Sequence, residues 1–69
     1  MIEIFKTNIT SKKAASRIAA ELRDKIPDAK INFDLADRDR ILRIDHGADI
    51  VEEVRGHLND RGFICEWLG

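Results

Sequence analysis

The sequence has one cysteine, one proline and no tyrosine among its 69 residues. A single thiol, Cys65, cannot form an internal disulfide, and this cysteine usage fits a reducing compartment. No apolar run is long enough for a transmembrane helix, and the opening MIEIFK lacks the basic and apolar regions of a signal peptide. We therefore expect a cytoplasmic protein that has no membrane partner.

An excess of positive charge is also missing. The chain has twelve lysines and arginines and thirteen acidic residues, so its net charge is −1. The chain therefore has no global basic field to attract nucleic acid. A single-stranded RNA reader would also need stacking aromatics in its sheet, but the segment RILRIDH has none and Phe5 stands alone. We expect no nucleic-acid partner, and an exposed or half-buried Phe5.

Apolar residues make up 43% of the chain and recur with regular spacing, which predicts one folded domain over residues 1–69. Ile2 to Thr7 reads as a strand. A helix follows, with Thr10 or Ser11 as its N-cap, and Pro27 ends it near Lys25. Its apolar stripe consists of Ala15, Ile18, Ala19, Leu22 and Ile26.

The second half repeats this pattern. Lys30 to Leu35 alternates as a half-buried strand, and Ile41 to His46 reads as the next one. Asp49 suits the start of a second helix and Gly62 its end, before a last strand from Phe63 to Leu68. The stripe of that helix consists of Ile50, Val51, Val54 and Leu58.

The predicted order is β-α-β-β-α-β. It predicts a ferredoxin-like α+β fold, in which a four-stranded antiparallel sheet carries both helices on one face. The last strand has apolar residues on both faces, so one set must face away from the helices, and we expect Phe5 and Ile41 on that outer face too. Such a patch suits a protein partner or a homodimer, and the alternative is an imperfectly covered sheet in a small domain. The two sets are Phe63, Cys65 and Trp67, against Ile64 and Leu68.

Residues for catalysis or metal binding are not grouped in the sequence. His46, His57 and Cys65 lie on different elements without the short spacing of ligand pairs. We expect Cys65 to be a small buried residue, His57 to be solvated or at a boundary, and His46 to lie at a strand end. No nucleophile–base pair is visible, and KTNITSKK lacks the glycines of an anion-cradling loop. We therefore expect no enzyme and no cofactor.

The stretch ITSKKA, residues 9–14, resembles a known motif. The heavy-metal-associated (HMA) domain of copper chaperones and metal-transporting ATPases has the same element order and about this length, and its mark is Met-Thr-Cys-x-x-Cys after the first strand. Here Thr10 matches, Ile18 matches the apolar anchor, and Gly62 with Phe63 resembles the Gly-aromatic pair of the last strand. The chain is thus similar to an HMA domain.

The metal ligands of that family are missing here. Ser11 and Ala14 stand where the family has its two thiolates, and Ile9 replaces the methionine. Soft cations such as Cu(I) need thiolate or thioether sulfur, so the metal site looks degenerate and a bound metal is not expected. Ser11 instead suits a helix N-cap.

Four cations surround this loop: Lys6, Lys12, Lys13 and Arg17. The resemblance implies that basic residues here help the domain to dock on acidic partners, and we call these four the basic rim. The alternative is that they are ordinary solvated side chains.

The leading expectation is therefore a small non-enzymatic HMA-like module without the dithiolate site, working through protein contacts. One alternative is a metal-binding or metal-transport-related domain with atypical ligands, such as Cys65 with a histidine. A second alternative is a domain that senses a small ligand.

Overall fold

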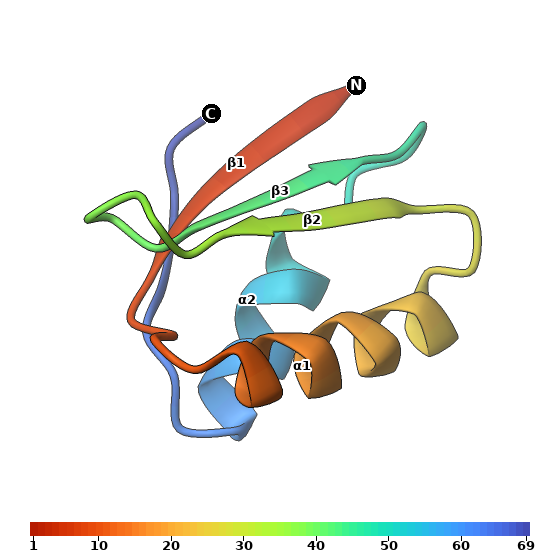
Figure 1. Cartoon of the computed structure of the whole chain (residues 1–69). Helices are drawn as coiled ribbons and strands as arrows, with labels where there is room; N and C mark the ends of the chain where they lie inside the picture. Colours follow the sequence, from red (N-terminus) through yellow and green to blue (C-terminus); the bar gives the residue numbers. More distant parts are fainter.

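The computed structural model describes all 69 residues and has the ferredoxin-like α+β fold that the sequence predicts. The two helices and four strands follow one another in the order β-α-β-β-α-β (Figure 1). Their bounds are β1 Ile2–Thr7, α1 Lys12–Lys25, β2 Lys30–Asp34, β3 Ile41–Asp45, α2 Val51–Asp60 and β4 Cys65–Trp67.

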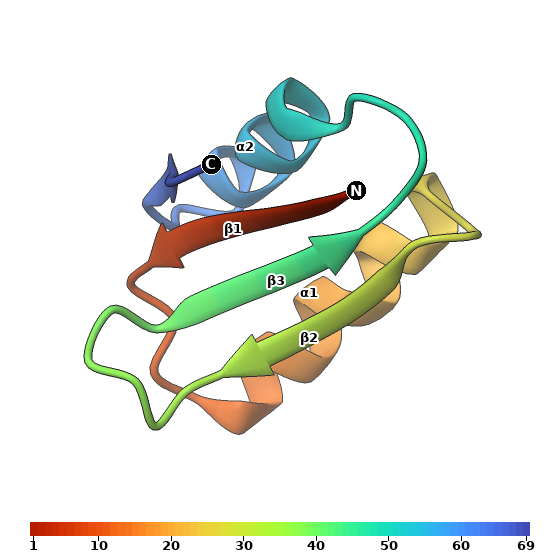
Figure 2. The same cartoon turned by 90° about the horizontal axis from the view of Figure 1, so that it is seen from above.

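The strands form one antiparallel sheet in the spatial order β2-β3-β1-β4. Both helices cover the same face of this sheet (Figure 1), and the other face carries no helix. Seen from above, α1 runs below β2, whereas α2 lies on the β1 side of the sheet, where it contacts β4 (Figure 2). In the strand order β2-β3-β1-β4, the two edge strands are β2 and β4. Neither helix has the length and apolar character needed to cross a bilayer.

Helix α1 begins and ends as the sequence predicts. The Ser11 hydroxyl accepts a hydrogen bond from the Ala14 backbone N–H at 3.2 Å, which satisfies one free donor of the first turn. The residues that face the core are Ala15, Ile18, Ala19 and Leu22. The helix stops after Lys25, because Pro27 disfavours helical geometry at Ile26.

Gly62 closes α2 in the left-handed region, with φ of +85°. Its N–H donates to the Asn59 carbonyl, and the Phe63 N–H donates to the Leu58 carbonyl. A side chain would be strained at this φ, so glycine is favoured here. This turn sends the chain back toward the sheet and lets β4 pair with β1.

Phe5 is the main error of the sequence interpretation. It is fully buried, whereas we expected it on the outer face of the sheet. Residues directly opposite in an antiparallel pair share a face, and Phe5 lies opposite Leu42, which is also fully buried. The inner residues of β1 are therefore Glu3, Phe5 and Thr7. Fourteen residues form the apolar core: Phe5, Ile9, Ala15, Ile18, Leu22, Ile26, Ala29, Leu42, Ile44, Ile50, Val51, Val54, Leu58 and Cys65.

His57 is the second correction. We expected a solvated or boundary residue, but only 3% of it is exposed. Its Nε2 lies 2.8 Å from Glu21 Oε1, and Arg61 Nε donates to the same oxygen at 3.1 Å. A carboxylate only accepts hydrogen bonds, so Nε2 carries the proton. This cross-helix bond, which no local pattern shows, makes burial of the imidazole tolerable.

The last strand is shorter than predicted and sorts its apolar residues by face. Cys65 lies opposite Thr7 and Trp67 lies opposite Phe5, so both are on the helix side of the sheet. Ile64 and Leu68 alternate with them and are 64% and 49% exposed. Ile41 lies opposite Lys6 on the outer face, as expected.

Candidate functional site

The loop that resembles a metal motif is used for packing and capping. Ile9 is fully buried, and its N–H donates to Thr7 Oγ1 at 3.2 Å. The Thr7 hydroxyl in turn donates to the Arg40 carbonyl at 2.6 Å, which ties the loop to the turn before β3. Ser11 caps α1, and Ala14 packs partly buried against the core. These three positions stabilise the fold where the resembled family has sulfur.

Other metal ligands do not come together. The structure contains no group of three or more His, Cys, Asp or Glu side chains that could hold a metal ion. Burial raises the pKa of the Cys65 thiol to about 11, so the sulfur is protonated at neutral pH and is a poor ligand and nucleophile. His57 Nε2 is hydrogen-bonded to Glu21 Oε1. His46 Nδ1 accepts a hydrogen bond from the Ala48 N–H at 3.1 Å.

The four cations of the basic rim are divided between two surfaces. Lys6 lies on the outer face of the sheet, where its Nζ is 3.7 Å from Asp39 Oδ1. Lys12, Lys13 and Arg17 are exposed on the first half of α1 and make no ion pair. Lys13 and Arg17 are one helical turn apart and therefore share a side of the helix. The structure groups the three helix cations and places Lys6 apart from them.

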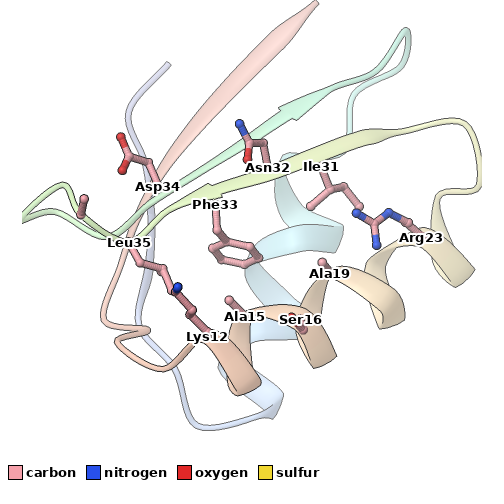
Figure 3. A pocket seen from close by; sticks show the side chains of 11 residues that line it. Lys12, Ala15, Ser16, Ala19, Arg23, Ile31, Asn32, Phe33, Asp34 and Leu35 are labelled. Atoms are coloured by element: carbon pink, nitrogen blue, oxygen red, sulfur yellow. The ribbon is translucent and has the colours of Figure 1, made fainter.

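A groove of about 510 Å³ runs between α1 and the edge strand β2 (Figure 3). Its strand side is formed by Ile31, Phe33 and Leu35, which are partly buried against the core. Phe33 points from β2 toward the small side chain of Ala15 (Figure 3). The helix side is lined by the short side chains of Ala15, Ser16 and Ala19, and this keeps the groove open.

The ends of the groove are charged. Lys12 lies at one end and Arg23 at the other, both on α1 (Figure 3). Asn32 and Asp34 alternate with the apolar residues of β2 and point away from the helix. The groove is therefore lined mainly by apolar side chains, with Ser16, Asn32 and Asp34 as polar residues along it and a cation at each end of its helix wall.

The strand beside this groove has a free edge. β2 pairs with β3 on one side and has no strand on the other. In an antiparallel strand, alternate residues direct their backbone N–H and C=O groups to each side, so the outer half of these groups is available to another chain.

The sequence interpretation did not predict this groove. Its parts were visible, because the alternation of Ile31, Phe33 and Leu35 was evident, and Ala15 and Ala19 lay on the predicted stripe of α1. The predicted ferredoxin-like order already implies that β2 is an edge strand. What the sequence does not show is that the short side chains of α1 leave a groove open beside this edge.

Comparisons of the chain with protein-family models, with curated proteins and with solved structures find no match. The resemblance to the HMA domain therefore stays a prediction.

Proposed function

We propose that this chain is a small, non-enzymatic HMA-like module that lacks the dithiolate metal site and binds a protein partner in the groove between α1 and β2. The partner would contribute an extended segment that adds a fifth strand to the sheet at β2. The observation that carries this proposal is the combination of an open strand edge with an apolar groove of about 510 Å³ directly beside it.

An added strand fits both features at once. Its backbone would pair with the free N–H and C=O groups of β2, which supplies affinity without requiring a particular sequence. Side chains of a strand alternate between two faces, so every second residue of the segment would point into the groove. There it would contact Phe33 and Ile31 on one side and the small residues of α1 on the other.

The charges of α1 indicate the chemistry of the segment's ends. Lys12 and Arg23 lie at the two ends of the groove, and Lys13 and Arg17 add positive charge to the same helix. None of the four is neutralised by an ion pair within the chain. A partner with apolar alternate residues and acidic flanks would therefore be favoured, and the flanks would speed association at low salt.

The loss of the metal site agrees with this proposal. Restoring a soft-metal site would require sulfur at positions where Ile9, Ser11 and Ala14 now serve packing and capping. A contact surface that does not depend on the loop would leave these positions free to stabilise the fold.

The proposal can be tested by selection and blocking. We would select binders from a random 12-residue peptide library displayed on phage, and we expect alternating apolar residues with acidic flanks. Ser16→Phe should abolish binding of these peptides, because it fills the groove from an exposed helix position. Ala20→Phe is the matched control, since it adds the same ring to an exposed position of α1 outside the groove.

The two variants separate the possible outcomes. If both bind selected peptides as tightly as the parent chain, the groove is not the binding surface. If the parent chain yields no peptide consensus and forms a dimer that Ser16→Phe disrupts, the occupant of β2 is a second copy of this chain rather than a foreign segment. Thermal melts of both variants confirm that the fold is intact.

A further inference from the structure

A second hollow, of about 450 Å³, lies on the opposite half of the molecule. It is formed by the start of β1, the first turns of α2 and the end of β4, and it shares no residue with the groove at β2. Three carboxylates, Glu3, Asp49 and Glu52, line it together with Arg55 and the indole of Trp67.

Glu3 is the unusual residue of this pocket. Only 9% of it is exposed, because it lies on the inner face of β1 opposite the fully buried Ile44. No hydrogen bond and no ion pair reaches its carboxylate, although it lines the pocket. Its oxygens are not among the buried atoms without a partner, so the carboxylate still reaches solvent, and it does so in the pocket that it lines.

The neighbouring charges do not neutralise Glu3. Arg55 donates from Nη1 to Glu52 Oε1 at 2.8 Å, and its Nε is buried without an acceptor. Asp49 Oδ1 accepts from the Val51 N–H at 3.2 Å, which leaves its negative charge unpaired. The N-terminal ammonium of Met1, which also lines the pocket, lies 3.4 Å from Asp45 Oδ1. The pocket therefore has more carboxylates than cations, and Glu3 is the least exposed of its three acidic residues.

Trp67 adds a second feature that suits a cation. It is 49% exposed and lies on the helix side of β4, and its indole lines the same pocket. Cations are attracted to the face of an indole within about 6 Å of the ring, more strongly than to other aromatic rings. A carboxylate and an indole that share a pocket favour an organic cation over a neutral ligand.

We propose that this pocket binds an organic cation, an ammonium or guanidinium group, with Glu3 as its counter-ion and Trp67 as its aromatic contact. A metal ion does not fit, since no three of these carboxylates lie close enough together to ligate one. The volume of about 450 Å³ suits a ligand larger than a single ion. The cation belongs either to a free amine or guanidine, or to a lysine or arginine side chain of a peptide.

Tryptophan fluorescence reports this pocket directly, because Trp67 is the only tryptophan and the chain has no tyrosine. Butylammonium and methylguanidinium represent the free ligands, and blocked Gly-Lys-Gly and Gly-Arg-Gly tripeptides represent the side chains. Butanol and methylurea are neutral probes of similar shape. We expect saturable changes in Trp67 emission with the cations of at least one source and none with the neutral probes.

Glu3→Gln tests the role of the Glu3 carboxylate. It should weaken cation binding at least roughly tenfold. Glu66→Gln is the matched control, because Glu66 precedes Trp67 and loses the same charge, but lies on the outer face opposite Lys6. It should change affinity less than about twofold, since an exposed charge outside the pocket is screened by solvent and salt.

Three results would overturn the proposal. The first is a Trp67 emission that changes equally with neutral and cationic probes, or that changes with no probe at all. The second is an equal loss of affinity in Glu3→Gln and Glu66→Gln. The third is a melting temperature of Glu3→Gln below that of the parent chain. Glu3 makes no ion pair within the chain, and glutamine has nearly the same shape, so the fold should stay as stable; a less stable variant would show that Glu3 has a structural partner instead.

Discussion

Replacing Leu22 by alanine should remove most of the stability of this domain. Leu22 is fully buried on α1, in the core between the helices and the sheet. The substitution deletes three buried carbon groups at about 0.8 kcal/mol each and leaves a cavity, so it should cost about 3–5 kcal/mol. A single core in a chain of this length supplies only about 3–5 kcal/mol of stability. Leu22→Ala should therefore be largely unfolded at room temperature.

Urea titrations followed by far-UV circular dichroism measure this effect. Leu68→Ala is the matched control, because it makes the same chemical change at a side chain that is 49% exposed. The control should lose only about 1 kcal/mol, because about half of its surface stays in water after folding and its removal leaves no enclosed cavity. If Leu22→Ala unfolds cooperatively with a midpoint near that of the parent chain, the assignment of Leu22 to the core is wrong.

Three further predictions concern the loop and the contact between the helices. Lys12→Glu with Lys13→Glu should raise the free energy of unfolding by a few tenths of a kcal/mol per residue, because the first turn of α1 has no acidic residue. The same double variant should associate more slowly with acidic peptides at low salt, and unchanged on-rates would exclude a docking role. In a competition with a Cu(I) chelator, the parent chain should leave the metal with the chelator. The double variant Ser11→Cys with Ala14→Cys should instead take up one soft metal ion per chain. A folded double variant that takes up no metal would contradict the resemblance to the HMA domain. The hydrogen bond from His57 and the charge of Arg61 lower the pKa of Glu21 below its ordinary value of 4.5, so its ionised form stabilises the fold above that pH and this contribution is lost on acidification. Glu21→Gln should therefore reduce the fall in urea midpoint below about pH 4.5, and parallel pH profiles for both chains would refute this.

The sequence predicted the elements well because each has a local signature. Pro27 marks the end of α1, Gly62 marks the end of α2 with its φ of +85°, and Ser11 makes the predicted N-cap bond. These signals depend on residues within one or two turns of each other. Helix and strand bounds therefore agree within a few residues.

The faces of the strands were harder to predict. β1 has isoleucines on one face and Phe5 between Glu3 and Thr7 on the other, so hydrophobicity alone does not say which face is buried. Pairing with β3 decides it, because Phe5 lies opposite Leu42. The burial of His57 likewise depends on Glu21, a partner 36 residues away.

Both candidate sites depend on such long-range placement. The groove exists because β2 is an edge strand that lies above the small residues of α1, and the second pocket exists because Glu3 and Trp67 face the same side of the sheet. No spacing within one element predicts either arrangement. Only the residue types, alternating apolar side chains and an acid in a strand, were visible in advance.

The most direct test of the central claim is an NMR measurement on the isotope-labelled chain with a selected, unlabelled peptide. We predict interstrand nuclear Overhauser effects between the peptide backbone and residues Lys30–Asp34, together with slowed amide exchange at the outer edge of β2. The largest shift changes should follow Phe33, Ser16 and Ala19 along the groove. Contacts confined to Ile64 and Leu68 on the outer face, with β2 unchanged, would contradict the account.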